Sequence, residues 1–288
     1  MKVNPYDNFM DQSQIDPQLD IENHIWDIIP YFDTFMLRSS QTLEALEHQV
    51  DIPVGARDEE RIDVFPAREK GSPIIIFIHG GWWRLGTRKL FNFCIKGLAD
   101  LGFACISSDY ALCPKVGIPD ITTASRLAVA WAYRNAESIN GDAGRIFVTG
   151  HSAGGHQVGM LAITNWEGYG LPAGVIRGGI PISGLFDLRP FRYCWLQAKL
   201  QLTGDVVFNE SPLFHIPDSG PPLLVALGAE ESVEFHRQSE EFVAAWRNKG
   251  LRADYLDVEG EDHTTNIFKM FYADSQISQA ILHFAESC

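Results

Sequence analysis

The pattern of apolar residues along this chain changes near residue 73. From there on, short apolar segments recur between longer stretches of mixed polarity, at residues 74–78, 103–106, 146–148, 175–182, 223–227 and 255–258. Short continuous apolar runs are typical of strands that are buried on both faces of a sheet. Because candidate helices separate these runs, the pattern predicts an α/β fold with a mostly parallel central sheet and helices on both faces.

Three of the intervening stretches carry helix signals at their ends. Asp120 precedes an apolar stripe at helical spacing, and Asn140-Gly141 offers a stop. Ser232 and Gly250 bracket a second stripe, and Asp274 precedes a third near the carboxyl end. Serine and aspartate are typical of helix starts and glycine of helix ends, so these stretches predict the helices of the α/β fold.

Segments outside this repeat predict accessory structure. Residues 50–54 and 61–65 alternate apolar and polar positions around a turn, which predicts an antiparallel pair at a sheet edge. The segment 189–217 is rich in large apolar residues and is a candidate cap. Residues 1–50 predict one or two helices, interrupted at Pro30, that could line the mouth of a site. Their apolar positions are Ile21, Ile25, Trp26, Ile29, Phe32 and Phe35.

Composition favours one domain spanning residues 1–288, because 45% of the residues are hydrophobic and no repeat or flexible linker divides the chain.

The net charge is −14, without a run of lysine or arginine, so neither nucleic acid nor an anionic membrane is an expected partner.

The cellular compartment follows from the first residues and the cysteines. The amino terminus lacks a signal-peptide pattern, and the longest apolar run is too short to cross a bilayer. Five cysteines without paired spacing are typical of reduced thiols. We therefore expect a cytoplasmic protein.

Residues 145–156 hold the strongest candidate for chemistry. An apolar strand at 146–148 leads into the turn Gly150-His151-Ser152-Ala153-Gly154, and a helix pattern follows. Glycines two positions before and after Ser152 allow a sharp turn that exposes its Oγ. This strand-turn-helix pattern predicts a nucleophilic serine.

Other strand ends supply partners for Ser152, since the carboxyl ends of parallel strands meet at one sheet edge. His79-Gly80-Gly81 follows the first buried strand, and the N–H groups near Gly80, Gly81 and Ala153 could hold a developing oxyanion. We expect His79 to brace this loop by hydrogen bonding.

The acid and the base are sought at the later strand ends. Two adjacent carboxylates, Glu230 and Glu231, follow residues 223–227, and spacing does not choose between them. Of nine histidines, only His263 lies in a loop directly after a late strand. The order of serine, acid and His263 is the one that a nucleophile-elbow hydrolase requires.

Motifs for metals and cofactors are missing from the sequence. It contains no His-Glu-x-x-His, no Cys-x-x-Cys and no glycine-rich nucleotide-binding pattern. We predict no metal and no cofactor.

Together these residues resemble an α/β-hydrolase with a His-Gly-Gly oxyanion loop, and most of all the kynurenine formamidase (arylformamidase) and carboxylesterase group. The similarity covers about residues 50–270. The matching segments are His79-Gly80-Gly81-Trp82-Trp83-Arg84, Ser108-Asp109-Tyr110-Ala111-Leu112-Cys113-Pro114, Gly150-His151-Ser152-Ala153-Gly154-Gly155-His156, Ser211-Pro212-Leu213 and Glu234-Phe235-His236-Arg237-Gln238-Ser239.

The resemblance implies a serine hydrolase that cleaves an aryl formamide such as N-formylkynurenine. It places the acid three positions before Glu234, at Glu231, and it allows a homodimer. We expect Trp82, Trp83 and the aromatic residues of the cap to enclose the substrate ring. A carboxylesterase for short-chain or aromatic esters would use the same residues. A small-molecule receptor on this fold is a third possibility, although a receptor has no need of a complete triad.

Overall fold

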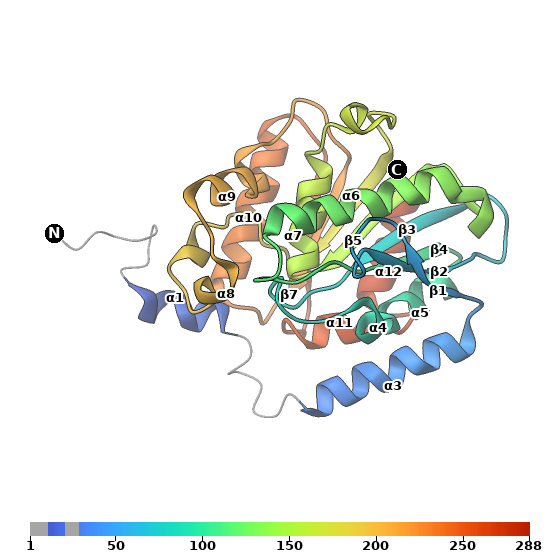
Figure 1. The fold of residues 1–288 in the computed structure, drawn as a ribbon, viewed down its shortest axis with the longest axis horizontal. Coiled ribbons are helices and arrows are strands. Elements are labelled where there is room, and N and C mark those ends of the chain that lie inside the picture. The colour runs from blue at the N-terminus through green and yellow to red at the C-terminus, as the bar shows by residue number, and fades with distance from the viewer. Residues whose placement is uncertain (1–10, 21–28) are drawn as a thin grey trace.

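The central element of the computed structural model is one eight-stranded sheet (Figure 1). The structure describes residues 11–20 and 29–288. The strand order is β1-β2-β4-β3-β5-β6-β7-β8. The strands are β1 (Gln49–Pro53), β2 (Arg61–Phe65), β3 (Ser72–Ile78), β4 (Ala104–Ser108), β5 (Gly141–His151), β6 (Ile176–Ile182), β7 (Leu223–Gly228) and β8 (Ala253–Val258).

Strands β3 to β8 run parallel, whereas β2 pairs antiparallel with both β1 and β4. Both the predicted parallel sheet and the predicted antiparallel pair at its edge are therefore confirmed. Strand β3 shows why the sheet is buried on two faces. Ile74, Ile76 and Ile78 belong to one hydrophobic cluster, whereas Ile75 and Phe77 belong to another, because successive side chains of a strand point to opposite faces.

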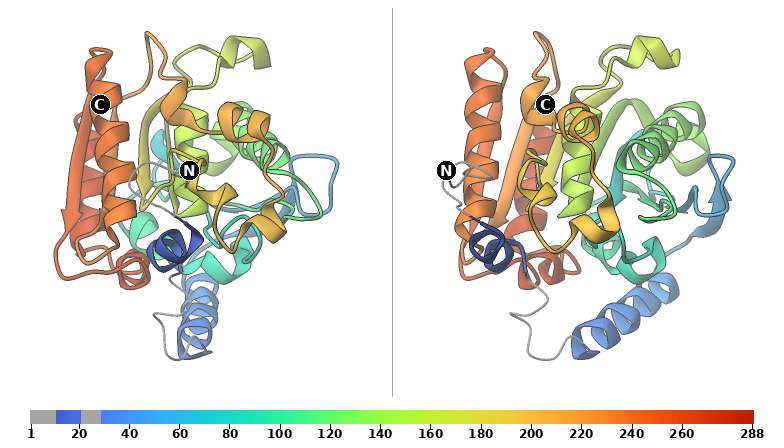
Figure 2. Two further views of the ribbon diagram at one scale, coloured as in Figure 1. Left: turned by 90° about the vertical axis from the view of Figure 1, so that its left-hand side faces the viewer. Right: turned by 60° about the vertical axis from the view of Figure 1, so that its left-hand side comes forward.

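Helices cover both faces of the sheet (Figure 2). The clusters place α6, α7 and α10 over one face and α5, α11 and α12 over the other. The helix predicted from Ser232 to Gly250 is α10, with Ser232 at its N-cap position. The bounds are α4 (Arg88–Phe91), α5 (Phe93–Asp100), α6 (Ile118–Asn135), α7 (Ala153–Ala162), α10 (Val233–Asn248), α11 (Thr265–Lys269) and α12 (Gln276–Glu286).

Two described helices precede the sheet, α1 (Gln12–Leu19) and α3 (Ile29–Ala45). The predicted break at Pro30 is wrong, since Pro30 is the second residue of α3. A proline in the first turn leaves a helix intact, because the N–H that it lacks has no partner within the helix there. The positions Ile21, Ile25 and Trp26 lie outside the described residues.

Short helices and turns form the segment 189–217. They are η3 (Pro190–Arg192), α8 (Gln197–Leu200), α9 (Gly204–Asn209) and η4 (Pro212–Phe214); the turns η1 (Ala136–Ile139) and η2 (Trp166–Tyr169) lie elsewhere. Buried side chains of the segment, including Phe191 and Leu196, join the hydrophobic cluster that holds Trp82 and Trp83. Within the described part of the chain, no helix combines the length and apolarity needed to cross a membrane.

Candidate active site

Ser152 lies between the end of β5 and the start of α7, as the sequence predicts. Its backbone has φ 58° and ψ −117°, in a region that non-glycine residues seldom occupy. The N–H of Ser152 donates to the carbonyl of Ile182 on the neighbouring strand at 2.9 Å. The sheet therefore holds the serine in a strained turn, which is the backbone arrangement of a nucleophile elbow.

Close backbone contact explains the glycine two positions after Ser152. A Cβ atom at Gly154 would lie 2.0 Å from the carbonyl oxygen of Ile78 at the end of β3. No side chain fits at that distance, so only glycine lets α7 begin against the β3 strand end. The same contact brings the loop that follows β3 close to Ser152.

His263 and Glu231 form a buried pair at the ends of β8 and β7. The Nδ1 atom of His263 lies 2.7 Å from Oε2 of Glu231, whose side chain is fully buried. The other carboxylate oxygen accepts hydrogen bonds from Ser183 Oγ at 2.5 Å and from the N–H of Gly228 at 2.8 Å. By contrast, Glu230 is exposed. The geometry thus brings Glu231 to His263, and not Glu230.

The second nitrogen of His263, Nε2, is buried without a hydrogen-bond partner among the described residues. Since Nδ1 donates to Glu231, Nε2 carries the lone pair in the neutral ring and can accept a proton. Ser152 and His263 line the same cavity. Nε2 is therefore available to a group that enters the cavity beside Ser152.

Two further residues that contact the pair were missed by sequence reasoning. Ser183, which bonds Glu231, directly follows β6, so an inspection of every strand end would have included it. His151 donates from Nε2 to the carbonyl of His263 at 2.9 Å. Burial, and secondarily the nearby charge of His263, hold the pKa of His151 well below its usual range. His151 thus supports the His263 loop as a neutral ring.

The loop after β3 reaches the cavity with Gly81 and Trp82. Gly81, Trp82 and Trp83 all have positive φ angles, of 117°, 51° and 56°. The carbonyl of Gly81 accepts hydrogen bonds from the N–H groups of Arg84 and Leu85, which closes a tight turn. Ala153 is the first residue of α7, so its N–H has no acceptor within that helix.

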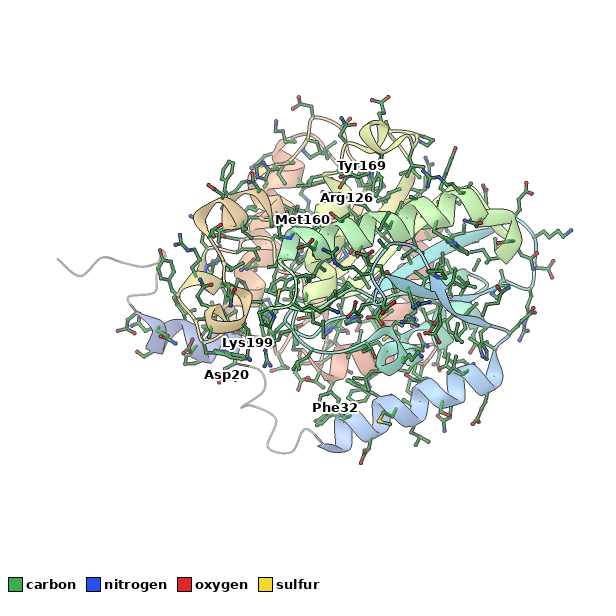
Figure 3. The ribbon with its side chains drawn as sticks, viewed as in Figure 1. Asp20, Phe32, Arg126, Met160, Tyr169 and Lys199 are labelled. Carbon is green, nitrogen blue, oxygen red and sulfur yellow. The ribbon has the colours of Figure 1, made fainter. Side chains whose placement is uncertain are left out.

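The cavity beside Ser152 has a volume of about 110 Å³. Helix α3 contributes three aromatic residues to it and the 189–217 segment contributes none, which corrects the prediction that cap aromatics enclose the substrate. Figure 3 labels Phe32 on α3 and Lys199 on α8. The described lining residues are Tyr31, Phe32, Phe35, Gly81, Trp82, Leu85, Gly86, Leu90, Phe91, His151, Ser152, His263, Thr264 and Ile267.

Trp83 does not line this cavity, unlike its neighbour Trp82. Its side chain is fully buried, and its Nε1 donates to Nδ1 of His156 at 3.2 Å. Phe191 of the 189–217 segment packs edge-on against it, with ring centroids 5.4 Å apart. We therefore remove Trp83 from the expected substrate contacts and retain Trp82, whose ring is nearly parallel to that of His263.

The hydrogen bond from Trp83 makes the stability of the folded protein sensitive to protonation of His156. His156 donates from Nε2 to the carbonyl of Glu210 at 2.7 Å, so Nδ1 must remain unprotonated to accept from Trp83. Burial lowers the pKa of His156 to about 4. Because the folded pKa is depressed, its stabilising contribution is complete above the unfolded value near pH 6.5 and is lost as the pH falls toward 4.

We expect this ring alone to lower the free energy of unfolding by about 2 kcal/mol between pH 8 and pH 5. Urea unfolding of the wild type and of His156→Gln at both pH values measures the effect. The variant should lose correspondingly less stability on acidification. Equal losses in the two proteins would contradict this assignment.

The described residues offer no metal-binding cluster. They contain no group of three or more histidine, cysteine, aspartate or glutamate side chains that could hold a metal ion.

Known proteins resemble this chain in both sequence and fold. The family model described as BD-FAE matches residues 62–169. A kynurenine formamidase of Danio rerio is 26% identical over 240 residues, which cover 81% of this chain and 80% of that protein. Esterase LipC of Mycobacterium tuberculosis is 27% identical over 243 residues, which cover 75% of this chain and 59% of that protein.

A solved structure resembles this chain as well. A protein of Silicibacter sp. tm1040, described provisionally as a thioesterase, superposes with a TM-score of 0.83 at 25% identity, over 93% of this chain and 98% of that one. The protein therefore has the α/β-hydrolase fold. Its sequence is similar to those of kynurenine formamidases and carboxylesterases.

Proposed function

We propose that the protein is a serine hydrolase in which Ser152 is the nucleophile, His263 the general base and Glu231 the carboxylate that orients the base. One observation carries the proposal. His263 has one nitrogen on a buried carboxylate, its other nitrogen has no partner within residues 11–20 and 29–288, and it shares a cavity with a serine in a strained elbow. This is the arrangement that serine acyl transfer requires.

The reaction then proceeds in two halves. Nε2 of His263 takes the proton of Ser152 Oγ while Oγ bonds to the substrate carbonyl carbon. N–H groups of Gly81 and Ala153, with those near Gly80, stabilise the oxyanion. The protonated His263 gives its proton to the leaving nitrogen or oxygen as that bond breaks, and water repeats the steps to release the acid. Each oxyanion donor should contribute about 3 kcal/mol.

For the substrate, we propose an aryl formamide such as N-formylkynurenine, which would yield formate and an aromatic amine. Two observations support this choice. Relatives that match 81% of this chain are kynurenine formamidases. In addition, the cavity presents aromatic side chains from α3, α4 and the loop after β3, which suit an aromatic ring.

A carboxylesterase acting on short-chain or aromatic esters is the second candidate, and one feature of the cavity favours it. The described lining residues include no carboxylate, lysine or arginine. N-formylkynurenine carries an ammonium and a carboxylate group, and buried charges need partners. An uncharged ester needs none.

Three substrates separate these candidates: N-formyl-L-kynurenine, the uncharged aryl formamide formanilide, and p-nitrophenyl acetate. We expect both formamides to be cleaved, with kcat/KM values that exceed the ester value once each is divided by its uncatalysed rate constant. Rapid cleavage of the ester with negligible cleavage of both formamides would contradict the formamidase proposal and support the esterase. Cleavage of formanilide alone would confine the activity to uncharged formamides.

A further inference from the structure

Beneath the loop that follows β3, His79 lies fully buried with both ring nitrogens facing oxygen atoms. Nδ1 is 2.7 Å from the carbonyl oxygen of Gly80, and Nε2 is 3.0 Å from Oδ1 of Asp109. A carbonyl oxygen and an ionised carboxylate can only accept hydrogen bonds. If Asp109 is ionised, each nitrogen of His79 must therefore carry a proton, and the ring is an imidazolium.

The surroundings of Asp109 keep its carboxylate ionised. Its Oδ2 accepts from Arg88 at 2.7 Å, and its Oδ1 also accepts from the N–H of Tyr110 at 3.1 Å. Arg88 and the N–H of Tyr110 can only donate hydrogen bonds, so both favour the ionised carboxylate of Asp109 whatever the state of His79. Asp109 thus has no proton to donate to His79.

The buried charges also balance only when His79 is protonated. The side chains of Asp63 and Asp109 are almost wholly buried, and Arg88 bonds both of them, at 2.8 and 2.7 Å. Two carboxylates against one guanidinium leave one negative charge uncompensated, and a charged His79 cancels it. Nearer the surface, Asp51 contacts both Arg88 and Lys89, so this outer carboxylate has a cation of its own.

Two aromatic rings enclose the imidazole of His79. The ring of Tyr110 is nearly parallel to it, with centroids 4.2 Å apart, and the ring of Phe91 lies 5.7 Å away. The hydroxyl of Tyr110 donates to the carbonyl of His79 at 2.9 Å. Aromatic faces attract cations, so this environment favours the imidazolium electrostatically as well as fixing its orientation.

The bond from His79 to Gly80 has a consequence for the neighbouring N–H. The peptide between Gly80 and Gly81 is trans, since the one cis bond of the described residues is Cys113-Pro114. In a trans peptide the C=O and the following N–H point in opposite directions. With the Gly80 carbonyl held against His79, the N–H of Gly81 points away from the buried ring, and Gly81 lines the cavity beside Ser152.

We propose that His79 is a buried imidazolium that acts as a positioning residue: its Nδ1–H fixes the Gly80 carbonyl and so aims the Gly81 N–H at the substrate oxyanion. This inference rests on the proposed serine hydrolase function. Asp109 and Arg88 keep the ring charged and in place. The loop is thereby organised before substrate binds, which is the condition for strong electrostatic stabilisation of an oxyanion.

Nuclear magnetic resonance on the wild-type protein tests whether the His79 ring is charged. In protein labelled with ¹⁵N-histidine, the His79 signals are identified by their loss in His79→Gln. Because each ring nitrogen of His79 faces an oxygen that can only accept a hydrogen bond, both nitrogens should carry protons in the wild type at pH 7. A neutral His79 ring at pH 7 would overturn the inference.

Two variants test the positioning role. Asparagine at residue 79 places an amide near the position of Nδ1 and can still bond Gly80, whereas glutamine places its amide near Nε2 and can bond only Asp109. His79→Gln should lower kcat by about 10²-fold with KM little changed, and His79→Asn should retain most of that activity. If His79 served only to donate a hydrogen bond to Asp109, His79→Gln would have the higher kcat of the two variants.

Equal or reversed kcat values for the two variants would overturn the positioning role, even where Ser152-dependent hydrolysis is intact. Hydrolysis that survives the loss of Ser152 would instead contradict the proposed function, and the resonance result on His79 would stand independently. If one variant fails to fold, the loss of signals in the other identifies the His79 ring, and the protonation of that ring in the wild type still decides whether it is an imidazolium.

Discussion

Ser152→Ala should lower kcat by about 10⁶-fold on whichever substrate the wild type hydrolyses. The reason is that alanine has no oxygen to form the acyl-enzyme, while the cavity, the oxyanion donors and His263 stay in place. Substrate affinity should change little, because the hydroxyl contributes little to the aromatic surface of the cavity. Steady-state kinetics on the purified variant, with product binding as the affinity measurement, checks both expectations.

The matched control for this variant is covalent labelling. A fluorophosphonate should modify the wild type at Ser152, located by mass spectrometry, and should leave Ser152→Ala unmodified. Near-normal hydrolysis by Ser152→Ala would contradict the acyl-enzyme mechanism. A wild type that binds aromatic ligands but neither turns over nor reacts with the probe would instead be a small-molecule receptor on this fold.

Glu231→Gln should lower kcat by about 10⁴-fold without changing the size of the side chain. The carboxylate accepts a hydrogen bond from the Nδ1–H of His263 at 2.7 Å, which leaves the lone pair on Nε2. The amide group of glutamine can donate to Nδ1 and so favour the opposite tautomer, in which Nε2 carries a proton and cannot accept the one from Ser152. The pH dependence of kcat and the rate of fluorophosphonate labelling both measure this loss.

The adjacent residue provides the control. Glu230→Gln removes a carboxylate from the same strand end, but Glu230 is exposed and its backbone N–H, not its side chain, bonds the neighbouring loop at Glu261. Its kcat should stay within about twofold of the wild type, as for a screened surface charge. A larger loss in Glu230→Gln than in Glu231→Gln would show that the acid has been misassigned.

Helix α3 has the position from which substrate selectivity is expected to arise. Tyr31, Phe32 and Phe35 all line the cavity, and Phe35 also stacks on Phe93 with ring centroids 4.8 Å apart. This packing connects the aromatic wall of the cavity to the core beneath the sheet. Relatives that share the elbow but differ in this amino-terminal helix would accordingly present a different wall to their substrates.

The sequence by itself determined the sheet, the turn that holds Ser152 and the position of His263 at a strand end. Buried strands are recognisable because their apolar runs are local, and the residues that follow them converge at one edge whatever the loops do. Ser152, His263 and the glycine loop were found in this way. Each of these residues lies in the turn or loop directly after a strand, so its position at the sheet edge could be predicted from the sequence of that strand and the residues after it.

Tertiary structure decided three further points. Glu230 and Glu231 are adjacent, and only the bonds from Ser183, Gly228 and His263 select Glu231. Trp83 points into the core and Trp82 lines the cavity. The aromatic wall comes from α3 and not from residues 189–217. In each case the outcome depends on side-chain direction and on contacts between segments far apart in sequence, which no local pattern of hydrophobic and polar residues encodes.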